Sequence, residues 1–155
     1  MIHVLLTKLK TVDGNILVTM NSQEAMLIQV RTANDLAQPI ENIYDQVTQR
    51  AYEIFRERGA IGTLDLEDWL TAEQQLLFKP QARVEETDLK VTVTICIGEA
   101  CPLNIQVVVT PDAMLIQAES SLNSKKIFRT VEFPRRIMVN KAEARFVNGC
   151  LVVTA

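Results

Sequence analysis

Hydrophobic and polar residues alternate with a period of two through much of the second half of the chain. In LKVTVTICI, residues 89–97, the alternation places one set of apolar residues on a single side: Leu89, Val91, Val93, Ile95 and Ile97. Such a pattern indicates a strand with one buried face. The run NIQVVVT, residues 104–110, repeats it, and short strands separated by Gly-, Pro- and Asn-containing turns follow. We therefore expect residues 83–155 to form an immunoglobulin-like antiparallel β-sandwich.

Between residues 40 and 78 the period becomes that of a helix. Apolar residues recur at steps of three and four, which is typical of a helix with one packed face: Ile40, Ile43, Tyr44, Val47, Ala51, Ile54 and Phe55. After Gly59 and Gly62 a second stripe follows: Leu66, Trp69, Leu70, Glu73, Leu76 and Leu77. The segment is predicted to be a helical hairpin, and its eight acidic against three basic residues predict an acidic solvated face.

Residues 1–39 are the least regular part of the chain. Asp13-Gly14 lies between two β-rich runs and predicts the turn of a β-hairpin. The following run AMLIQVRT, residues 25–32, fits either a third strand or the start of a helix, and its β-branched residues favour the strand. The predicted fold class is thus mainly β with α: a β-sandwich, an N-terminal helical hairpin and a possible β-hairpin.

Composition narrows the classes of function. The 155 residues suffice for one domain or two small ones, and 48% hydrophobic residues support a real core. A net charge of −3 without a long basic run argues against nucleic-acid binding. No apolar stretch reaches the ~20 residues that cross a bilayer, so no membrane association is expected. Three cysteines, an odd number, favour a reducing cytosol over a disulfide framework, which predicts a cytoplasmic location.

Candidate catalytic chemistry is sparse. His3 is the one histidine, so no Ser/His/Asp or Cys/His relay is evident. Cys96 and Cys101 are four residues apart in the pattern C-x4-C, and Cys150 lies far away in sequence. We interpret the cysteines as small apolar fillers rather than as zinc ligands. No enzyme activity, cofactor or metal is expected.

The strand region carries motifs of a known family. Ile127, Arg129, Val131, Phe133 and Pro134 match an aromatic-x-Arg-x-aromatic-x-Leu-Pro pattern, with aliphatic residues replacing two aromatics. The run ARFVNGCL, residues 144–151, matches Ala-x-Phe/Leu-x-Asn-Gly-Val-Leu. With these motifs in order, about half of the chain resembles the α-crystallin domain of small heat shock proteins. The resemblance implies an ATP-independent chaperone that holds non-native proteins.

The chain also departs from that family. Its members usually carry a polar tail with an Ile-x-Ile segment, which docks in a groove of a neighbouring domain, and no residue follows Ala155. Bacterial members exchange a long loop in their dimers, whereas residues 120–126 join the corresponding strands here. Both departures predict a monomer or dimer rather than a large cage-like oligomer.

The helical segment resembles an uncharacterised bacterial helix-hairpin family. The matching residues are Arg50, Ala51, Tyr52, Gly59, Trp69, Leu70, Ala72 and Glu73. Because the function of that family is unknown, the match supplies architecture alone.

Two binding features follow from the strand region. The final strand CLVVT is apolar on both faces, so Cys150, Leu151, Val152 and Val153 are candidates for lining an apolar groove, or for a strand buried on both sides. Ile2-His3-Val4 or Ile16-Leu17-Val18 could fill such a groove. Arg129, between apolar Ile127 and Val131, is a candidate for an interface salt bridge.

Two hypotheses of function remain open. The first is a holdase that binds non-native proteins through apolar sandwich surface. The second is an adaptor without chaperone activity, which recognises a specific partner through the sandwich groove and the acidic helical hairpin.

Overall fold

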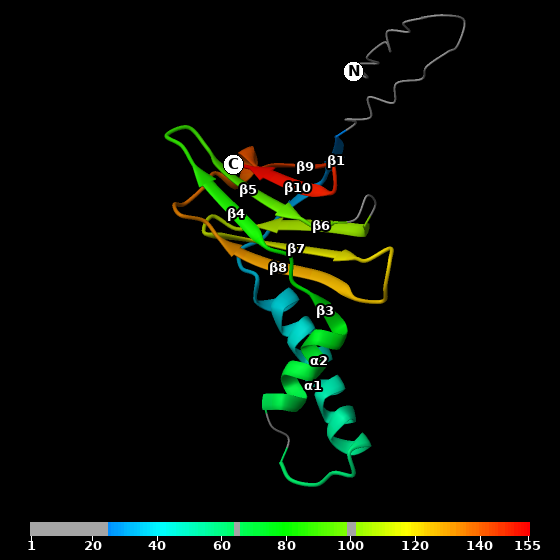
Figure 1. The fold of residues 1–155 in the computed structure, drawn as a ribbon. Helices are drawn as coiled ribbons and strands as arrows, with labels where there is room; N and C mark the ends of the chain where they lie inside the picture. Colours follow the sequence, from blue (N-terminus) through cyan, green and yellow to red (C-terminus); the bar gives the residue numbers. More distant parts are fainter. Residues whose placement is uncertain (1–24, 64–65, 99–101) are drawn as a thin grey trace, which may run out of the picture.

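The fold consists of two packed β-sheets and a projecting pair of helices (Figure 1). The structure is a computed structural model, and it describes residues 25–63, 66–98 and 102–155. The first sheet has the order β1-β9-β10-β5-β4 and is antiparallel throughout. Its strands are β1 Met26–Ile28, β9 Glu143–Val147, β10 Cys150–Thr154, β5 Val91–Cys96 and β4 Ala82–Glu86. A 3₁₀ turn, Val139–Lys141, precedes β9.

The second sheet has the order β2-β6-β7-β8-β3. Its strands are β2 Val30–Thr32, β6 Leu103–Val109, β7 Ala113–Glu119, β8 Lys126–Glu132 and β3 Leu77–Phe78. The three central strands pair antiparallel, and the short strands β2 and β3 add parallel edges. The predicted class, a mainly β sandwich with helices, is confirmed.

Side chains from the inner faces of both sheets form the main core. It contains the alternating residues of β5 and β6 that the sequence pattern picks out, Val91, Val93, Ile95, Val107 and Val109, all at most 1% exposed. Leu89 is an exception to the predicted alternation, because it is 93% exposed. It lies before β5 in a turn where the Thr87 amide donates to the Lys90 carbonyl, so strand alternation does not yet apply there.

The helical hairpin packs on the outer face of the second sheet and then extends beyond it (Figure 1). Its helices are α1 Ala37–Glu57 and α2 Leu66–Leu76. α1 begins three residues before the predicted start, where the Ala37 amide donates to Asp35 Oδ1 at 3.0 Å. Pro39 then lies in the first turn, where its missing N–H breaks no helical hydrogen bond.

The packed face of α2 agrees with the predicted one only in part. Trp69 and Leu76, and Leu77 just after the helix, pack in the cluster beneath the helices as expected. Leu66 and Leu70 are 70% and 46% exposed, while Asp68 and Ala72 are buried. The reason is an ion pair, in which Arg58 Nη2 at the end of α1 lies 2.8 Å from Asp68 Oδ2. This pair turns the polar Asp68 inward and leaves the two leucines in solvent.

Other expectations for the first part of the chain have different outcomes. The run AMLIQVRT forms β1 and β2 rather than the start of a helix. The predicted hairpin at Asp13-Gly14 lies outside the described residues. Within the described ranges, no helix is both long enough and apolar enough to cross a membrane.

Candidate functional site

One edge of the sandwich is closed by a single extended segment that pairs with both sheets. We call residues 26–32 the bridging segment. Its first half, β1, pairs antiparallel with β9, with Ile28 opposite Ala144. Its second half, β2, pairs parallel with β6, with Val30 opposite Val107. Without this segment, β9 and β6 would be the outermost strands of their sheets on this side.

The bridging segment inserts two aliphatic side chains between the sheets. Ile28 and Val30 are partly buried and pack against the main core, while Gln29 between them is exposed. The segment therefore presents an aliphatic-x-aliphatic motif to the protein. Leu27, 80% exposed, points to the opposite side of the same strand.

The receiving surface is apolar and built from both sheets. From β6 it has Val107 and Val109, both 0% exposed, and from β9 it has Ala144 and Phe146, at 2% and 5%. These residues belong to the same core cluster as Ile28 and Val30. Fully burying one such aliphatic side chain stabilises by roughly 1.5–3 kcal/mol, and these two are only partly buried. These two side chains therefore contribute a modest free energy, in addition to the main-chain pairing with β9 and β6.

The four predicted groove residues lie in the strand next to this edge. Leu151 and Val153 are buried in the main core, at 0% and 1% exposed. Cys150 and Val152 lie on the outer face and are half-buried. β10 lies between β9 and β5, so the edge that accepts an extra strand belongs to β9. A direct role of these four residues in binding stays a prediction.

The interpretation of the cysteines as unpaired fillers is wrong for two of them. Cys96 and Cys150 form a disulfide between β5 and β10. The antiparallel register places the two residues directly opposite each other on the outer face of the first sheet. A separation of 54 residues concealed this pair in the sequence. The cysteine content therefore no longer favours a reducing compartment.

Arg129 lies in β8 on the side that faces the main core, between buried Ile127 and Val131. Its Nε is buried and has no hydrogen-bond partner among the described residues. A buried donor without a partner costs free energy. The predicted interface salt bridge of Arg129 stays a prediction. The observation that bears on it is the buried Nε without a hydrogen-bond partner in the described part of the chain.

Other candidates are not brought into a site. His3, Ile2-His3-Val4, Ile16-Leu17-Val18 and Cys101 lie outside the described residues. In the part of the chain that the structure describes, no group of three or more His, Cys, Asp or Glu side chains has the geometry of a metal site.

Sequence reasoning missed the role of the bridging segment. The signal available was the alternation Ile28-Gln29-Val30 within a run of β-branched residues. This alternation predicts a strand, but nothing local to residues 26–32 identifies its partners β9 and β6.

The projecting hairpin carries its own network of charges. Arg50 of α1 contacts Glu53 and Glu57, each at 3.0 Å, and also donates from Nε to Gln75 of α2 at 2.8 Å. The hydrogen bond from Arg50 lowers the pKa of Glu53, and the two glutamates raise the pKa of Arg50. The hydrogen bond to Gln75 joins α1 to α2, whereas both ion pairs lie within α1.

Comparisons with known proteins give a family match and a similar solved structure. Residues 44–77, which span most of α1 and all of α2, match the family described as "Protein of unknown function (DUF2934)". No curated protein matches the sequence. Among solved structures, heat shock protein 16.0 from Schizosaccharomyces pombe is similar at 20% identity, over 57% of this chain and 80% of that chain, with a TM-score of 0.45.

Proposed function

We propose that this protein is an ATP-independent holdase that binds apolar segments of non-native proteins at the edge between β6 and β9. The observation that carries the proposal is the bridging segment. The edge accepts an extended aliphatic-x-aliphatic motif, and the occupant is the chain's own Ile28-Gln29-Val30. Extended apolar segments are what unfolded chains expose, and main-chain pairing with a sheet edge recognises them with little dependence on sequence.

The bridging segment acts as a competitive inhibitor in this proposal. It is part of the same chain, so its effective concentration at the edge is high and a weak client is excluded. Heat would favour release, because ordering seven residues costs conformational entropy, and only two partly buried side chains and the main-chain pairing with β9 and β6 oppose that cost. Binding then depends on the fraction of molecules whose edge is open.

The resemblance of residues 83–155 to the α-crystallin domain supports the same activity. In that family an Ile-x-Ile segment docks in a groove of a neighbouring domain, and Ile28-Gln29-Val30 is a motif of the same chemistry within one chain. We propose a monomer or a dimer as the active form, without ATP or another cofactor and without enzyme activity.

Two opposite variants test the proposal. Ile28→Ser/Val30→Ser removes the buried side chains and frees the edge, whereas Leu27→Cys/Arg145→Cys links two facing residues of β1 and β9. The measurement is light scattering from a heat-unfolding client protein at increasing chaperone ratios. We expect the freed variant to suppress aggregation at a lower ratio than wild type, and the oxidised linked variant to lose suppression.

Leu27→Ser is the matched control, since it changes an exposed side chain of the same strand. Circular dichroism establishes that each variant is folded at the assay temperature. Equal suppression by the freed and linked variants would remove the edge from the mechanism. No suppression by any folded variant would exclude the holdase.

A second candidate, the adaptor, is favoured by the hairpin. The helices extend beyond the sheet (Figure 1), and Leu66, Leu70 and Ile61 are exposed near the far end, at 70%, 46% and 74%. This candidate would be selected by two results together. The wild-type protein binds a folded partner stoichiometrically but does not suppress aggregation, and the variant Leu66→Ser/Leu70→Ser no longer binds that partner.

A further inference from the structure

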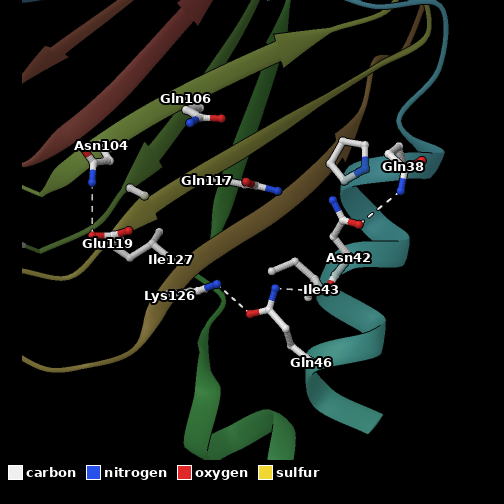
Figure 2. Close-up of a pocket in the computed structure, with 12 residues that line it drawn as sticks. Gln38, Asn42, Ile43, Gln46, Asn104, Gln106, Gln117, Glu119, Lys126 and Ile127 are labelled. Carbon is white, nitrogen blue, oxygen red and sulfur yellow. Dashed lines mark hydrogen bonds between the residues drawn. The ribbon is translucent and has the colours of Figure 1, made fainter. Parts of the chain in front are cut away.

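A cleft lined by carboxamide side chains lies between α1 and the outer face of the second sheet (Figure 2). Its volume is about 400 Å³. We call it the amide cleft. The amide-bearing residues are Gln38, Asn42 and Gln46 of α1, Asn104 and Gln106 of β6, and Gln117 of β7.

The cleft exists because α1 covers only part of the sheet's outer face. Val108, Leu115 and Phe128 point outward from the three central strands and pack under the helices. Farther along the same rows, Gln106 and Gln117 face outward and lie directly opposite each other. The sheet face thus changes from apolar to amide-bearing where the helix leaves it.

Four of the amides are held in place by hydrogen bonds. Gln38 Nε2 donates to Asn42 Oδ1 at 3.1 Å, and Gln46 Nε2 donates to the Asn42 carbonyl at 3.1 Å. Lys126 Nζ donates to Gln46 Oε1 at 2.6 Å. Across the cleft, Asn104 Nδ2 donates to Glu119 Oε2 at 3.2 Å. The walls are therefore ordered before any ligand arrives.

Gln106 and Gln117 are different, since neither side-chain amide has a hydrogen-bond partner among the described residues. Figure 2 shows Gln117 projecting from β7 toward α1. Each of the two side chains offers an acceptor oxygen and two donor hydrogens to the cleft.

The charges of the cleft argue against an ionic ligand. Lys126 and Glu119 contribute one charge of each sign, and each is already engaged by a wall amide. A phosphate or carboxylate site would present unpaired cations. The described lining residues include no aromatic ring, so neither a base nor a sugar ring finds a stacking surface.

Peptide main chain is the neutral chemistry that matches carboxamides. In an extended residue, the N–H and C=O groups point to the same side, as they do in a β-ladder. A carboxamide offers an oxygen and an N–H in the complementary arrangement. Two facing glutamines therefore suit an extended segment independently of its side chains.

We propose that the amide cleft binds the main chain of an extended, uncharged peptide segment. The cleft would be a second contact for non-native chains, and in this respect the inference rests on the proposed function. It adds a polar site that tolerates many sequences to the apolar site between β6 and β9. Few hydrogen bonds hold such a segment, so the dissociation constant lies in the millimolar range for a short peptide.

The test is titration of the full chain with the capped peptide acetyl-Ser-Ala-Thr-Ala-Ser-Ala-amide, followed by NMR of the glutamine side-chain amides. We expect the Gln106 and Gln117 resonances to shift. The same peptide N-methylated at alternate residues lacks those main-chain donors and should bind at least tenfold more weakly. Gln106→Thr/Gln117→Thr should weaken binding of the unmodified peptide at least fivefold, and Gln74→Thr on α2 should not.

The N-methylated peptide needs no protein variant, so the test stands if the double variant is unstable. Equal binding of both peptides, or shifts produced by maltotriose and not by the peptide, would overturn the proposal. Absence of any shift at several times a millimolar dissociation constant would also overturn it. Peptide binding without aggregation suppression would instead refute the proposed function and leave the amide cleft as a peptide site.

Discussion

Cys96 and Cys150 face each other across β5 and β10, with their Cα atoms 4.0 Å apart and their sulfur atoms bonded. The bond joins the first long strand of the sandwich to its last, across 54 residues that include β6, β7 and β8. It therefore constrains nearly the whole sandwich in the unfolded chain.

Removing this bond should lower stability substantially. Cross-linking a loop of this length stabilises by about 2–4 kcal/mol, mainly by restricting the unfolded state. We expect Cys96→Ala/Cys150→Ala to lower the free energy of unfolding in urea by that amount. A reductant should lower the stability of wild type to that of the variant and leave the variant unchanged. If a reductant leaves the free energy of unfolding of the wild type unchanged, the disulfide does not contribute to stability.

The side chains of the bridging segment should matter unequally. Ile28→Ala and Val30→Ala each remove partly buried methyl groups from the core cluster, and each should lower the free energy of unfolding by about 1 kcal/mol. Leu27→Ala removes an 80% exposed side chain and should change it by less than about 0.5 kcal/mol. Urea titration checks all three, and equal effects would mean that the segment is not docked in solution.

The ion pair that ends α1 should be important for the hairpin. The Asp68 side chain is 6% exposed and that of Arg58 is 37% exposed. Asp68→Ala leaves the guanidinium without its buried partner, but water reaches it, so the loss should be about 1–3 kcal/mol. Glu67→Ala changes the exposed neighbour and is the control. Thermal denaturation followed by circular dichroism distinguishes them, and equal melting temperatures would contradict the expectation.

Arg129 gives opposite expectations for a monomer and for a dimer. If a second copy supplies a carboxylate to this guanidinium, Arg129→Met should weaken the dimer at least tenfold in analytical ultracentrifugation. Arg136, 76% exposed in its side chain and bonded to Asp112, provides the control Arg136→Met. A monomeric wild type, with Arg129→Met more stable, would mean that the buried Nε is simply an unsatisfied donor.

The local sequence pattern was sufficient to predict an element and its buried side where residues close in the chain are also close in space. The alternation in β5 and most of the helical stripe of α1 could be predicted, because each reports which side of one element is buried. Ile40 and Tyr44 are the exceptions in the α1 stripe, at 39% and 61% exposed. The stripe of α2 was correct for Trp69, Leu76 and Leu77 and wrong for Leu66 and Leu70. Local pattern assigns a charged residue such as Asp68 to the solvent side, whereas its ion pair with Arg58 buries it.

Contacts between distant elements could not be predicted in this way. The disulfide depends on the register of β5 with β10, and the bridging segment depends on pairing with β9 and β6. The amide cleft depends on where α1 crosses the sheet. The sequences of β6 and β7 give no information about that position. In each case the role of a residue depends on its tertiary contacts, and the local sequence pattern around it does not distinguish it from other residues of its strand or helix.

The position of the bridging segment also orders the assembly of the molecule during synthesis. Ile28 is synthesised 116 residues before its neighbour Ala144. At roughly 5–20 residues per second, on the order of ten seconds separate the two. Contacts between residues so far apart in sequence form late. The closing of this edge is thus among the last steps of folding, and the newly made sandwich first exists with its edge open.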